Sequence, residues 1–437
     1  MIQIYDTSLP EDWIEKPLAQ MVQLRRGYTW TKESEIECSE DGTVPVVRIP
    51  NVQNRLDLTD LLYLRDVSPD ALEKAAVTKG WILFVGSNGT QDRIGDSVLM
   101  DEDREMVFAS FLMGMTSKDH DKLLPEFLAS WMRIQLVHEW FSKTSQQTTG
   151  LANYSWGAVK KLPLRFPSNV SEQRRIAAVL KLADDAIVKA KAELEATREL
   201  KRALENALLT GRLGRKNLPK QKTKAGELPH NWNVAPLKFV AVIDSGITLN
   251  QDRVPKDNPC RYLTVAHIQR AIVSSEEPRY LELSEVERET RLLAHGDLLV
   301  VEGHANSFEI GRTAMFEGFD EPTTYQNHLF RVRSDVQQLL PKFLLYVLNS
   351  ERVQRHWSAI CNTSSGLNTI NRRNLRNLLV QFPETTEQRR ILDSLEAGES
   401  SVTASEQKLI ALHQVKKSLL QNLLTGKIRI PEGVLNV

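Results

Sequence analysis

The chain has 437 residues, of which 41% are apolar and 26% are charged, and its 56 basic side chains balance its 56 acidic ones. This length and composition exclude a disordered or fibrous chain and predict a globular protein of two or three domains. The three cysteines, Cys38, Cys260 and Cys361, are too few and too far apart for a disulfide framework or a CxxC metal site. With no long apolar run and an acidic N-terminal segment, the sequence predicts a cytoplasmic protein, neither secreted nor inserted in a membrane.

Charge is segregated along the chain. The net charge is −9 over residues 1–150, +10 over 151–225, −5 over 226–350 and +4 over 351–437. This order of acidic, basic, acidic and basic segments is typical of one unit present twice.

The sequence repeats itself at a separation of 215 to 219 residues. Short motifs return in the same order in the second half, and their spacing changes by only a few residues. The matched segments are Leu9, Pro10 and Trp13 with Leu228, Pro229 and Trp232; Ile94-Gly95 with Ile310-Gly311; Gly150-Leu151 with Gly366-Leu367; Phe166-Pro167 with Phe382-Pro383; EQRRI at 172–176 with 387–391; and LLTG at 208–211 with 423–426. A repeat of this length is a whole domain rather than a solenoid unit.

In chain order, each copy begins with a segment of about 150 residues that mixes strand and helix patterns. Apolar runs bounded by Gly, Asn and Asp turns predict strands at 44–52 and 80–86, and again at 297–303 and 328–333. The segments 124–136 and 340–353 carry apolar residues at i, i+3 and i+4 and predict helices entered through proline. Each copy therefore begins with a predicted α+β globule.

Each copy then ends in one long predicted helix. Its N-cap is Ser171 in the first copy and Thr386 in the second, each followed by a glutamate in the first turn. It stops at the LLTG motif, where Gly211 or Gly426 suits the left-handed position after a helix.

Apolar residues in both long helices follow a spacing of four and three, which predicts a coiled-coil seam. Because both helices belong to one chain, we expect them to pair with each other in antiparallel fashion, as a spacer with approximate two-fold symmetry. Lys201 and Lys416 fall on this seam, where they either extend toward solvent or set the register. Gly398 weakens the second helix by about 1 kcal/mol. The predicted seam residues are Ile176, Leu180, Ile187, Leu194, Leu204, Leu208, Ile391, Leu395, Val402, Leu409, Leu412, Leu419 and Leu423.

These patterns predict five segments. The mixed domains are placed at 1–167 and 228–383, and the long helices at 168–211 and 384–430. Residues 212–227 lie between the two copies, and the stretch 211–226 contains basic residues, no acidic ones and no periodicity. We therefore predict a mobile basic linker there.

Familiar catalytic motifs are missing from the sequence. It contains no GxxxxGK[ST] phosphate loop, no glycine-rich methyl-donor loop and no GxSxG elbow. His138-Glu139 begins an HExxH zinc motif, but Ser142 stands where the second histidine belongs. Asn258-Pro259-Cys260 matches the amino-methyltransferase motif only in part, and the acidic residues at 69–74 are too closely spaced for metal ligands. We expect a chain that catalyses no reaction and binds no metal.

The duplicated EQRRI and LLTG motifs, which frame long helices behind α+β domains and LPxxW segments, resemble the specificity (S) subunit of type I restriction-modification systems. The resemblance covers essentially the whole chain. It implies that each mixed domain is a target-recognition domain for one half of a split DNA sequence, and that the helices set the spacer. It also implies two methyltransferase (M) subunits and restriction (R) subunits as partners, with S-adenosylmethionine, ATP and Mg on those partners and no cofactor on this chain. Prolines before the helices are fewer than usual, and Gly398 interrupts the second helix.

Two regions of each copy offer polar side chains suited to reading double-stranded DNA in the major groove. One follows a matched strand, where a solvated loop is the alternative, and the other precedes the long helix. For the arginines we expect phosphate contacts rather than base contacts. The candidates are Ser87, Asn88, Gln91, Arg93, Gln146, Gln147, Asn153, His304, Asn306, Ser307, Asn362, Asn368, Arg372 and Arg373.

The acidity of the mixed domains predicts weak DNA binding by the isolated chain, since non-specific affinity comes from phosphate neutralisation. Partner subunits would then dock on the basic linker and the outer helix faces, which carry Lys181, Lys189, Lys191, Arg198 and Arg202. Two alternatives stay open. One is a stand-alone bipartite DNA-binding protein, or the specificity subunit of a related methylation-based defence system without a restriction motor. The other is an enzyme with unfamiliar motifs.

Overall fold

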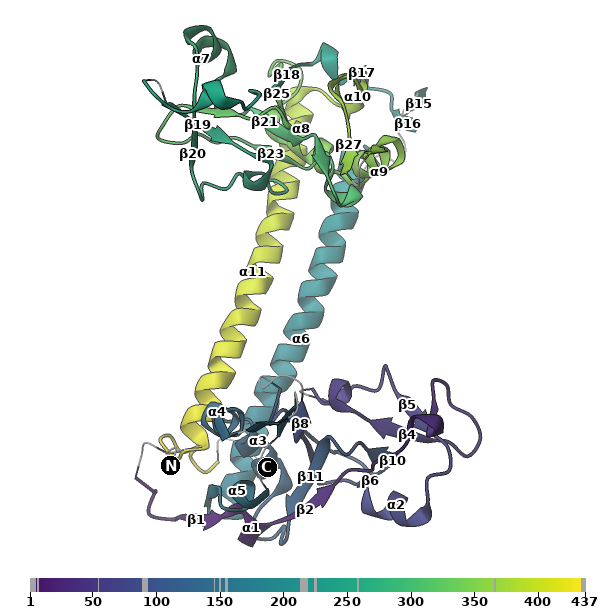
Figure 1. Cartoon of the computed structure of the whole chain (residues 1–437), viewed down its shortest axis with the longest axis vertical. Coiled ribbons are helices and arrows are strands. Elements are labelled where there is room, and N and C mark those ends of the chain that lie inside the picture. The colour runs from purple at the N-terminus through teal and green to yellow at the C-terminus, as the bar shows by residue number, and fades with distance from the viewer. Residues whose placement is uncertain are drawn as a thin grey trace. The chain divides into compact units, whose positions relative to one another are not determined.

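The computed structural model describes residues 5, 8–53, 55–88, 93–144, 146–148, 151–153, 156–212, 219–223, 226–257, 259–364 and 367–433. These residues form two compact units. Unit 1 comprises Met1–Ala192 and Gln407–Val437, and unit 2 comprises Glu193–Glu406. Each unit holds one mixed α+β domain and a part of both long helices, α6 (Val170–Leu209) and α11 (Thr385–Leu423) (Figure 1).

The mixed domain of unit 1 contains two main sheets. The larger has the order β3 (Glu35–Ile36), β5 (Leu62–Leu64), β4 (Val44–Val47), β10 (Arg104–Phe108), β6 (Ala76–Val77). The four-stranded sheet has the order β2 (Val22–Arg26), β11 (Leu112–Ser117), β7 (Ile82–Val85), β9 (Ser97–Leu99). Short helices accompany them: α1 (Leu18–Met21), α2 (Pro69–Lys74), α3 (Pro125–Met132), α4 (Gln135–Thr144) and α5 (Trp156–Lys160).

Unit 2 repeats the four-stranded sheet with the order β18 (Ala241–Ser245), β25 (Leu329–Ser334), β21 (Leu298–Val301), β23 (Thr313–Met315). Its second sheet has three strands, β20 (Arg279–Glu282), β19 (Pro259–Leu263) and β24 (Thr323–Tyr325), where unit 1 has five. The helices here are α7 (Glu285–Arg291), α8 (Pro341–Asn349), α9 (Glu351–Ile360) and α10 (Arg372–Asn377). The shared strand order confirms the predicted duplication.

In each four-stranded sheet, one of the two inner strands, β7 or β21, is buried on both faces. In β7, Ile82 and Phe84 enter one hydrophobic core, and Leu83 and Val85 enter another. The residues of β21 alternate in the same way between the two cores of unit 2. This explains the continuous apolar runs, because successive side chains of a strand point to opposite faces of the sheet.

A terminal strand pair closes each mixed domain beside the start of its long helix. In unit 1, β1 (Trp13–Pro17) pairs antiparallel with β14 (Pro163–Pro167). In unit 2, β17 (Asn233–Pro236) pairs in the same way with β28 (Leu379–Phe382). The LPxxW motif therefore lies close to the helix start within each copy.

Helix α6 begins at Val170, two residues earlier than an N-cap at Ser171 predicts. The side-chain oxygen of Asn169 accepts a hydrogen bond from the Ser171 N–H at 2.9 Å, and its carbonyl accepts one from Glu172. Asn169 is therefore the cap, a role that asparagine favours. Likewise α11 begins before Thr386, and the carbonyl of Glu384 accepts the N–H groups of Glu387 and Gln388.

Two other predictions needed correction. The segments 124–136 and 340–353 do not each form one helix: α3 ends before α4 begins, and Ser350 separates α8 from α9 as the N-cap of the latter. The basic linker is not wholly irregular, because β15 (Lys220–Thr223) pairs with β16 (Gly226–Pro229). Residues 213–218 of the linker lie outside the described residues.

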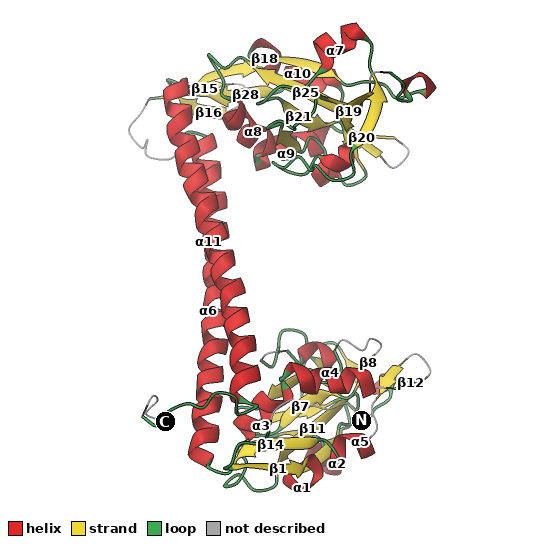
Figure 2. Ribbon diagram, turned by 90° about the vertical axis from the view of Figure 1, so that its left-hand side faces the viewer, coloured by secondary structure: helices red, strands yellow, loops and turns green. Residues whose placement is uncertain are grey.

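Within each unit the two long helices lie side by side (Figures 1 and 2). They run in opposite directions, as the pairs Arg198–Glu406 and Lys201–Glu399 show in unit 2. In unit 1, Lys416 pairs with Asp184 at 2.5 Å. In unit 2, Lys201 pairs with Glu399 at 3.3 Å. Both lysines of the predicted seam thus bind a carboxylate of the opposite helix, at positions equivalent by the duplication. This pairing favours a role in setting the register.

The coiled-coil seam is largely buried, and none of the predicted seam residues is exposed. Ile176, Leu180, Ile187 and Leu194 are buried, whereas apolar residues off the seam, such as Leu200, are exposed. At Gly398 an added Cβ would meet Lys201 Cγ at 3.6 Å, an ordinary contact. Packing therefore does not require glycine at this position.

A buried glutamine fastens the start of each long helix to the mixed domain. Gln173 is fully buried; its side-chain amide donates to the carbonyls of Lys122 and Pro167, each at 2.8 Å, and its side-chain oxygen accepts the Leu124 N–H at 2.9 Å. Gln388 repeats these three bonds with the corresponding backbone groups of unit 2. Because both copies share this geometry, the glutamine of EQRRI has a structural role.

Replacing Gln173 with leucine is expected to lower the free energy of unfolding by roughly 2–4 kcal/mol, because three backbone groups lose a buried partner. Chemical denaturation of the full-length protein measures the change. Gln388→Leu should cost a similar amount, whereas Gln407→Leu, exposed on α11, should stay within about 0.5 kcal/mol of the parent. Unchanged stability in both buried variants would contradict this role.

Candidate nucleic-acid interface

The two regions of candidate DNA contacts in each copy come together in a small three-stranded sheet. In unit 1 it consists of β8 (Ser87–Asn88), β13 (Leu151–Asn153) and β12 (Gln146–Thr148). In unit 2 it consists of β22 (Gly303–His304), β27 (Leu367–Thr369) and β26 (Asn362–Ser364). We call these the reading sheets. Each joins the strand after the matched core strand to the hairpin before the long helix.

The register of the reading sheets places the candidates opposite one another. In unit 1, Ser87 lies opposite Asn153, which lies opposite Gln146, and Asn88 and Gln147 both lie opposite Ala152. Gln91 lies outside the described residues. In unit 2, His304 lies opposite Asn368, and Asn362 lies opposite Thr369 on the other side of β27.

Hydrogen bonds between side chains and the backbone hold the loop after β22 in place. The side-chain oxygen of Asn306 accepts the Phe308 N–H at 3.0 Å, and the side-chain amide of Asn368 donates to the Ala305 carbonyl at 2.9 Å. These two candidates therefore build the loop, in which Ser307 is half-buried. His304 Nδ1 accepts the Asn306 N–H at 3.0 Å, so a neutral ring carries its proton on Nε2 and offers a donor there.

Arg93 of unit 1 also has a structural role. Its Nη2 donates to the Val52 carbonyl at 2.8 Å, and its Nε pairs with Asp96 at 3.1 Å. Asp96 in turn contacts Nε2 of His138 at 3.3 Å. Arg93 thus ties the segment after β8 to the rest of the domain, a role that its place in the sequence did not reveal.

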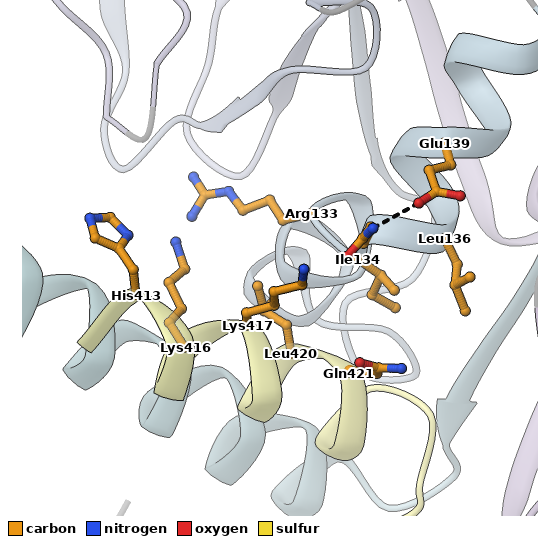
Figure 3. A pocket seen from close by; sticks show the side chains of 10 residues that line it. Arg133, Ile134, Leu136, Glu139, His413, Lys416, Lys417, Leu420 and Gln421 are labelled. Carbon is orange, nitrogen blue, oxygen red and sulfur yellow. Dashed lines mark hydrogen bonds between the residues drawn. The ribbon is translucent and has the colours of Figure 1, made fainter. Parts of the chain in front are cut away.

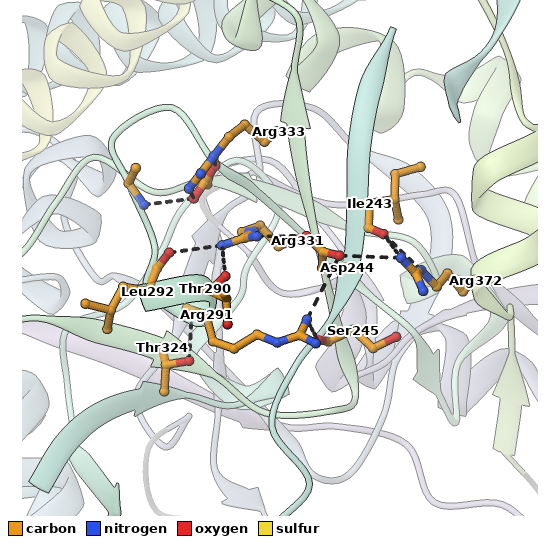
Figure 4. A network of polar contacts seen from close by, with 12 residues as sticks. Ile243, Asp244, Ser245, Thr290, Arg291, Leu292, Thr324, Arg331, Arg333 and Arg372 are labelled. Atoms are coloured by element: carbon orange, nitrogen blue, oxygen red, sulfur yellow. Dashed lines mark hydrogen bonds and ion pairs between the residues drawn. The ribbon is translucent and has the colours of Figure 1, made fainter. Parts of the chain in front are cut away.

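Arg372 and Arg373 begin α10, directly after the reading sheet of unit 2. Arg373 is exposed and makes no hydrogen bond or ion pair within the described part of the chain. Arg372 donates from Nε to the Ile243 carbonyl at 2.9 Å and lies 3.4 Å from the Asp244 carboxylate. Arg331 and Arg291 contact the same carboxylate (Figure 4). The pattern Arg-Val-Arg at 331–333, inside an apolar strand, was the available sequence signal for this cluster.

Unit 1 contains a groove of about 500 Å³ between α4 and α11 (Figure 3). Its floor is apolar, with Ile134, Leu136 and Leu420, and its rim carries Arg133, His413, Lys416 and Lys417 beside Glu139 and the amides Gln135 and Gln421. No sequence motif marks this groove, because its residues come from two segments about 280 positions apart.

Basic side chains on the rim of the groove outnumber the acidic side chains nearby. Asp184 pairs with both Arg133, at 3.2 Å, and Lys416, at 2.5 Å. Burial lowers the pKa of the Arg133 guanidinium, and the Asp184 carboxylate opposes this shift. Lys417 is exposed and has no ion pair among the described residues. The groove therefore suits a segment with an apolar face and acidic side chains.

The outer faces of the long helices are only partly available to a partner. Lys181, Lys189, Lys191 and Arg202 are exposed. Arg198 is not available as predicted, because it pairs with Glu406 on α11 at 2.7 Å and with Glu195 at 2.8 Å. None of the helices in the described part of the chain combines the length and apolarity of a membrane span.

Comparison with known proteins gives consistent matches. The family described as "Type I restriction modification DNA specificity domain" matches residues 10–196 and 229–414. The chain is 23% identical over 427 residues to the StySPI type I restriction enzyme specificity subunit of Salmonella potsdam, covering 96% of this chain and 89% of the relative. It is 22% identical over 431 residues to the EcoKI specificity subunit of Escherichia coli K12, covering 96% and 90%.

Solved structures share the fold. A chain from a structure described as the basis of complex assembly and conformational transition of the type I R-M system matches with a TM-score of 0.65 and 17% identity, covering 97% of this chain and all of the other. The HsdS subunit from Thermoanaerobacter tengcongensis matches with a TM-score of 0.56 and 16% identity, covering 97% and 99%.

Proposed function

The chain belongs to the type I restriction-modification DNA specificity family, and on that premise we propose that each mixed domain reads one half of a two-part duplex target. The observation that carries this proposal is the pair of reading sheets. Both sit at the same place on a duplicated scaffold, directly after the doubly buried core strand. A spacer of paired helices would keep the two half-sites at a fixed separation along the duplex.

The reading sheets present different side chains at equivalent positions, which is what unlike half-sites require. Where unit 1 has Asn88 opposite Ala152, unit 2 has His304 opposite Asn368. Asparagine suits the adenine edge, whereas a histidine N–H suits an acceptor such as those of guanine. The scaffold thus stays constant while the chemistry of the reading position changes.

Partner subunits would supply the chemistry. We infer that the complex methylates adenine and cuts DNA through methyltransferase and restriction subunits that hold S-adenosylmethionine, ATP and Mg. The charge of the mixed domains supports this division of labour, because neither a domain with a net charge of −6 (residues 1–167) nor one with a net charge of zero (residues 228–383) gains much affinity from phosphate neutralisation by itself. We further propose that an acidic, amphipathic segment of a methyltransferase subunit docks in the groove between α4 and α11.

Mapping methylated adenines in cells with and without this protein tests the function, and a two-part motif that depends on the protein is expected. His304→Ala should relax one half of the motif only, since a good base contact is worth about 1–3 kcal/mol of discrimination. Asn88→Ala should relax the other half. A motif that does not depend on the protein, or variants that both alter the same half, would contradict the proposal.

The isolated chain is expected to bind duplex DNA weakly, and addition of the methyltransferase subunit is expected to produce tight, steeply salt-dependent binding. Fluorescence anisotropy with and without that subunit measures the difference. Tight, salt-dependent binding by the chain alone would instead favour a stand-alone bipartite DNA-binding protein. Methyl transfer or cleavage by the purified chain would indicate an enzyme.

Lys417→Glu should weaken association with the methyltransferase subunit about tenfold, because it reverses a charge on the rim of the groove. Mass photometry of the mixed subunits measures this. Lys32→Glu, an exposed lysine of the same unit, serves as the matched control and should leave assembly unchanged. Equal assembly by the parent, Lys417→Glu and Lys32→Glu would exclude the groove as the docking site. Loss of assembly in Lys189→Glu instead would place the docking site on the outer helix face.

A further inference from the structure

Three arginines surround a single carboxylate in unit 2 (Figure 4). Asp244 of β18 lies 2.7 Å from Arg331, 3.4 Å from Arg372 and 4.0 Å from Arg291. These arginines come from β25, the start of α10 and the end of α7. One negative charge therefore faces three positive charges, and the cluster keeps an excess of about two.

Each guanidinium is held in place by backbone carbonyls. Arg331 donates to the carbonyls of Thr290 and Leu292 at 3.2 and 3.0 Å. Arg291 donates to the Ser245 carbonyl at 3.0 Å, and Arg372 donates to that of Ile243. Because these contacts fix the side chains before any ligand arrives, the entropy lost on binding an anion is small.

The fold does not require this cluster. In the four-stranded sheet of unit 2, Asp244 lies opposite Arg331, which lies opposite Leu299. The same register in unit 1 places Arg25 opposite Gly114, which lies opposite Leu83. Arg25 there lies over the ring of Trp81, 3.8 Å from its centre, and no carboxylate occupies its position. The same scaffold thus forms without the arrangement, which points to a function specific to the second domain.

Two of the three arginines are accessible. The side chains of Arg372 and Arg291 are 46% and 36% exposed, whereas that of Arg331 is buried, with 7% exposed. Arg372 follows the reading sheet by three residues. Guanidinium groups match the geometry of phosphate oxygens and often bind them in a bidentate manner.

We propose that Arg291 and Arg372 bind a backbone phosphate of the DNA half-site read by unit 2, with Asp244 and Arg331 as positioning residues. This inference rests on the proposed function. The phosphate contact fixes the register of the reading sheet on the duplex and carries no sequence information itself. It also gives the second domain a backbone anchor that the first domain lacks at this position.

The test uses the full-length chain with its methyltransferase subunits and a duplex that carries the motif found by methylation mapping. Arg291→Gln and Arg372→Gln should each reduce the slope of log affinity against log salt by about 1 and leave discrimination between sequences unchanged. Arg372→Lys should retain the slope, because it keeps the charge. When single phosphates of the duplex are replaced by neutral methylphosphonates, replacement at one position should weaken DNA binding by the parental complex. The same replacement should not weaken binding by the complex that carries both Arg291→Gln and Arg372→Gln.

The matched control is Arg279→Gln, an exposed arginine on β20 of the same unit, which should keep the parental slope. Parental slopes in both cluster variants, or an equal change in Arg279→Gln, would overturn the phosphate site alone. Absence of sequence-dependent binding by the parental complex would overturn the proposed function as well.

Discussion

The structure depends on the contacts by which each mixed domain holds the start of one long helix and the end of the other. In unit 1 the buried Gln173 holds the start of α6, and the left-handed Gly426 after α11 packs against Pro10 and Trp13 so closely that a Cβ would lie 2.5 Å from the proline ring. Gly211 meets Pro229 and Trp232 in the same way in unit 2. The LPxxW, EQRRI and LLTG motifs therefore recur together because they form one joint, in which a side chain added to the glycine would not fit.

This joint separates what must stay constant from what is free to change. The doubly buried strands β7 and β21 tolerate little variation, since every side chain there contacts a core, and the helix starts are held by the buried Gln173 and Gln388. The reading sheets lie beyond these strands and differ in residue type at equivalent registers, as Asn88 and His304 show. A protein built this way can acquire a new half-site by changing a few polar residues while the spacer and the joints remain as they are.

The sequence predicted the large features because they arise from repetition and periodicity. The duplication, the mixed domains and the antiparallel helix pair all follow from motifs and spacings. Local features were harder to predict: Asn169 as the helix cap depends on one hydrogen bond, and the break between α3 and α4 falls inside a continuous apolar pattern. The groove and the Asp244 cluster each join segments distant in sequence, so only a folded chain reveals them.

The net charge of the domains and their affinity for DNA are less opposed than composition suggests. Residues 228–383 carry 17 basic and 17 acidic side chains, and three of the arginines converge on Asp244. At physiological ionic strength the Debye length is about 8 Å, so acidic side chains elsewhere on the domain contribute little at the cluster. What a phosphate experiences there is the local excess of positive charge. A domain without net positive charge can therefore carry a specific contact to the DNA backbone, which leaves discrimination to the reading sheet and to the partner subunits.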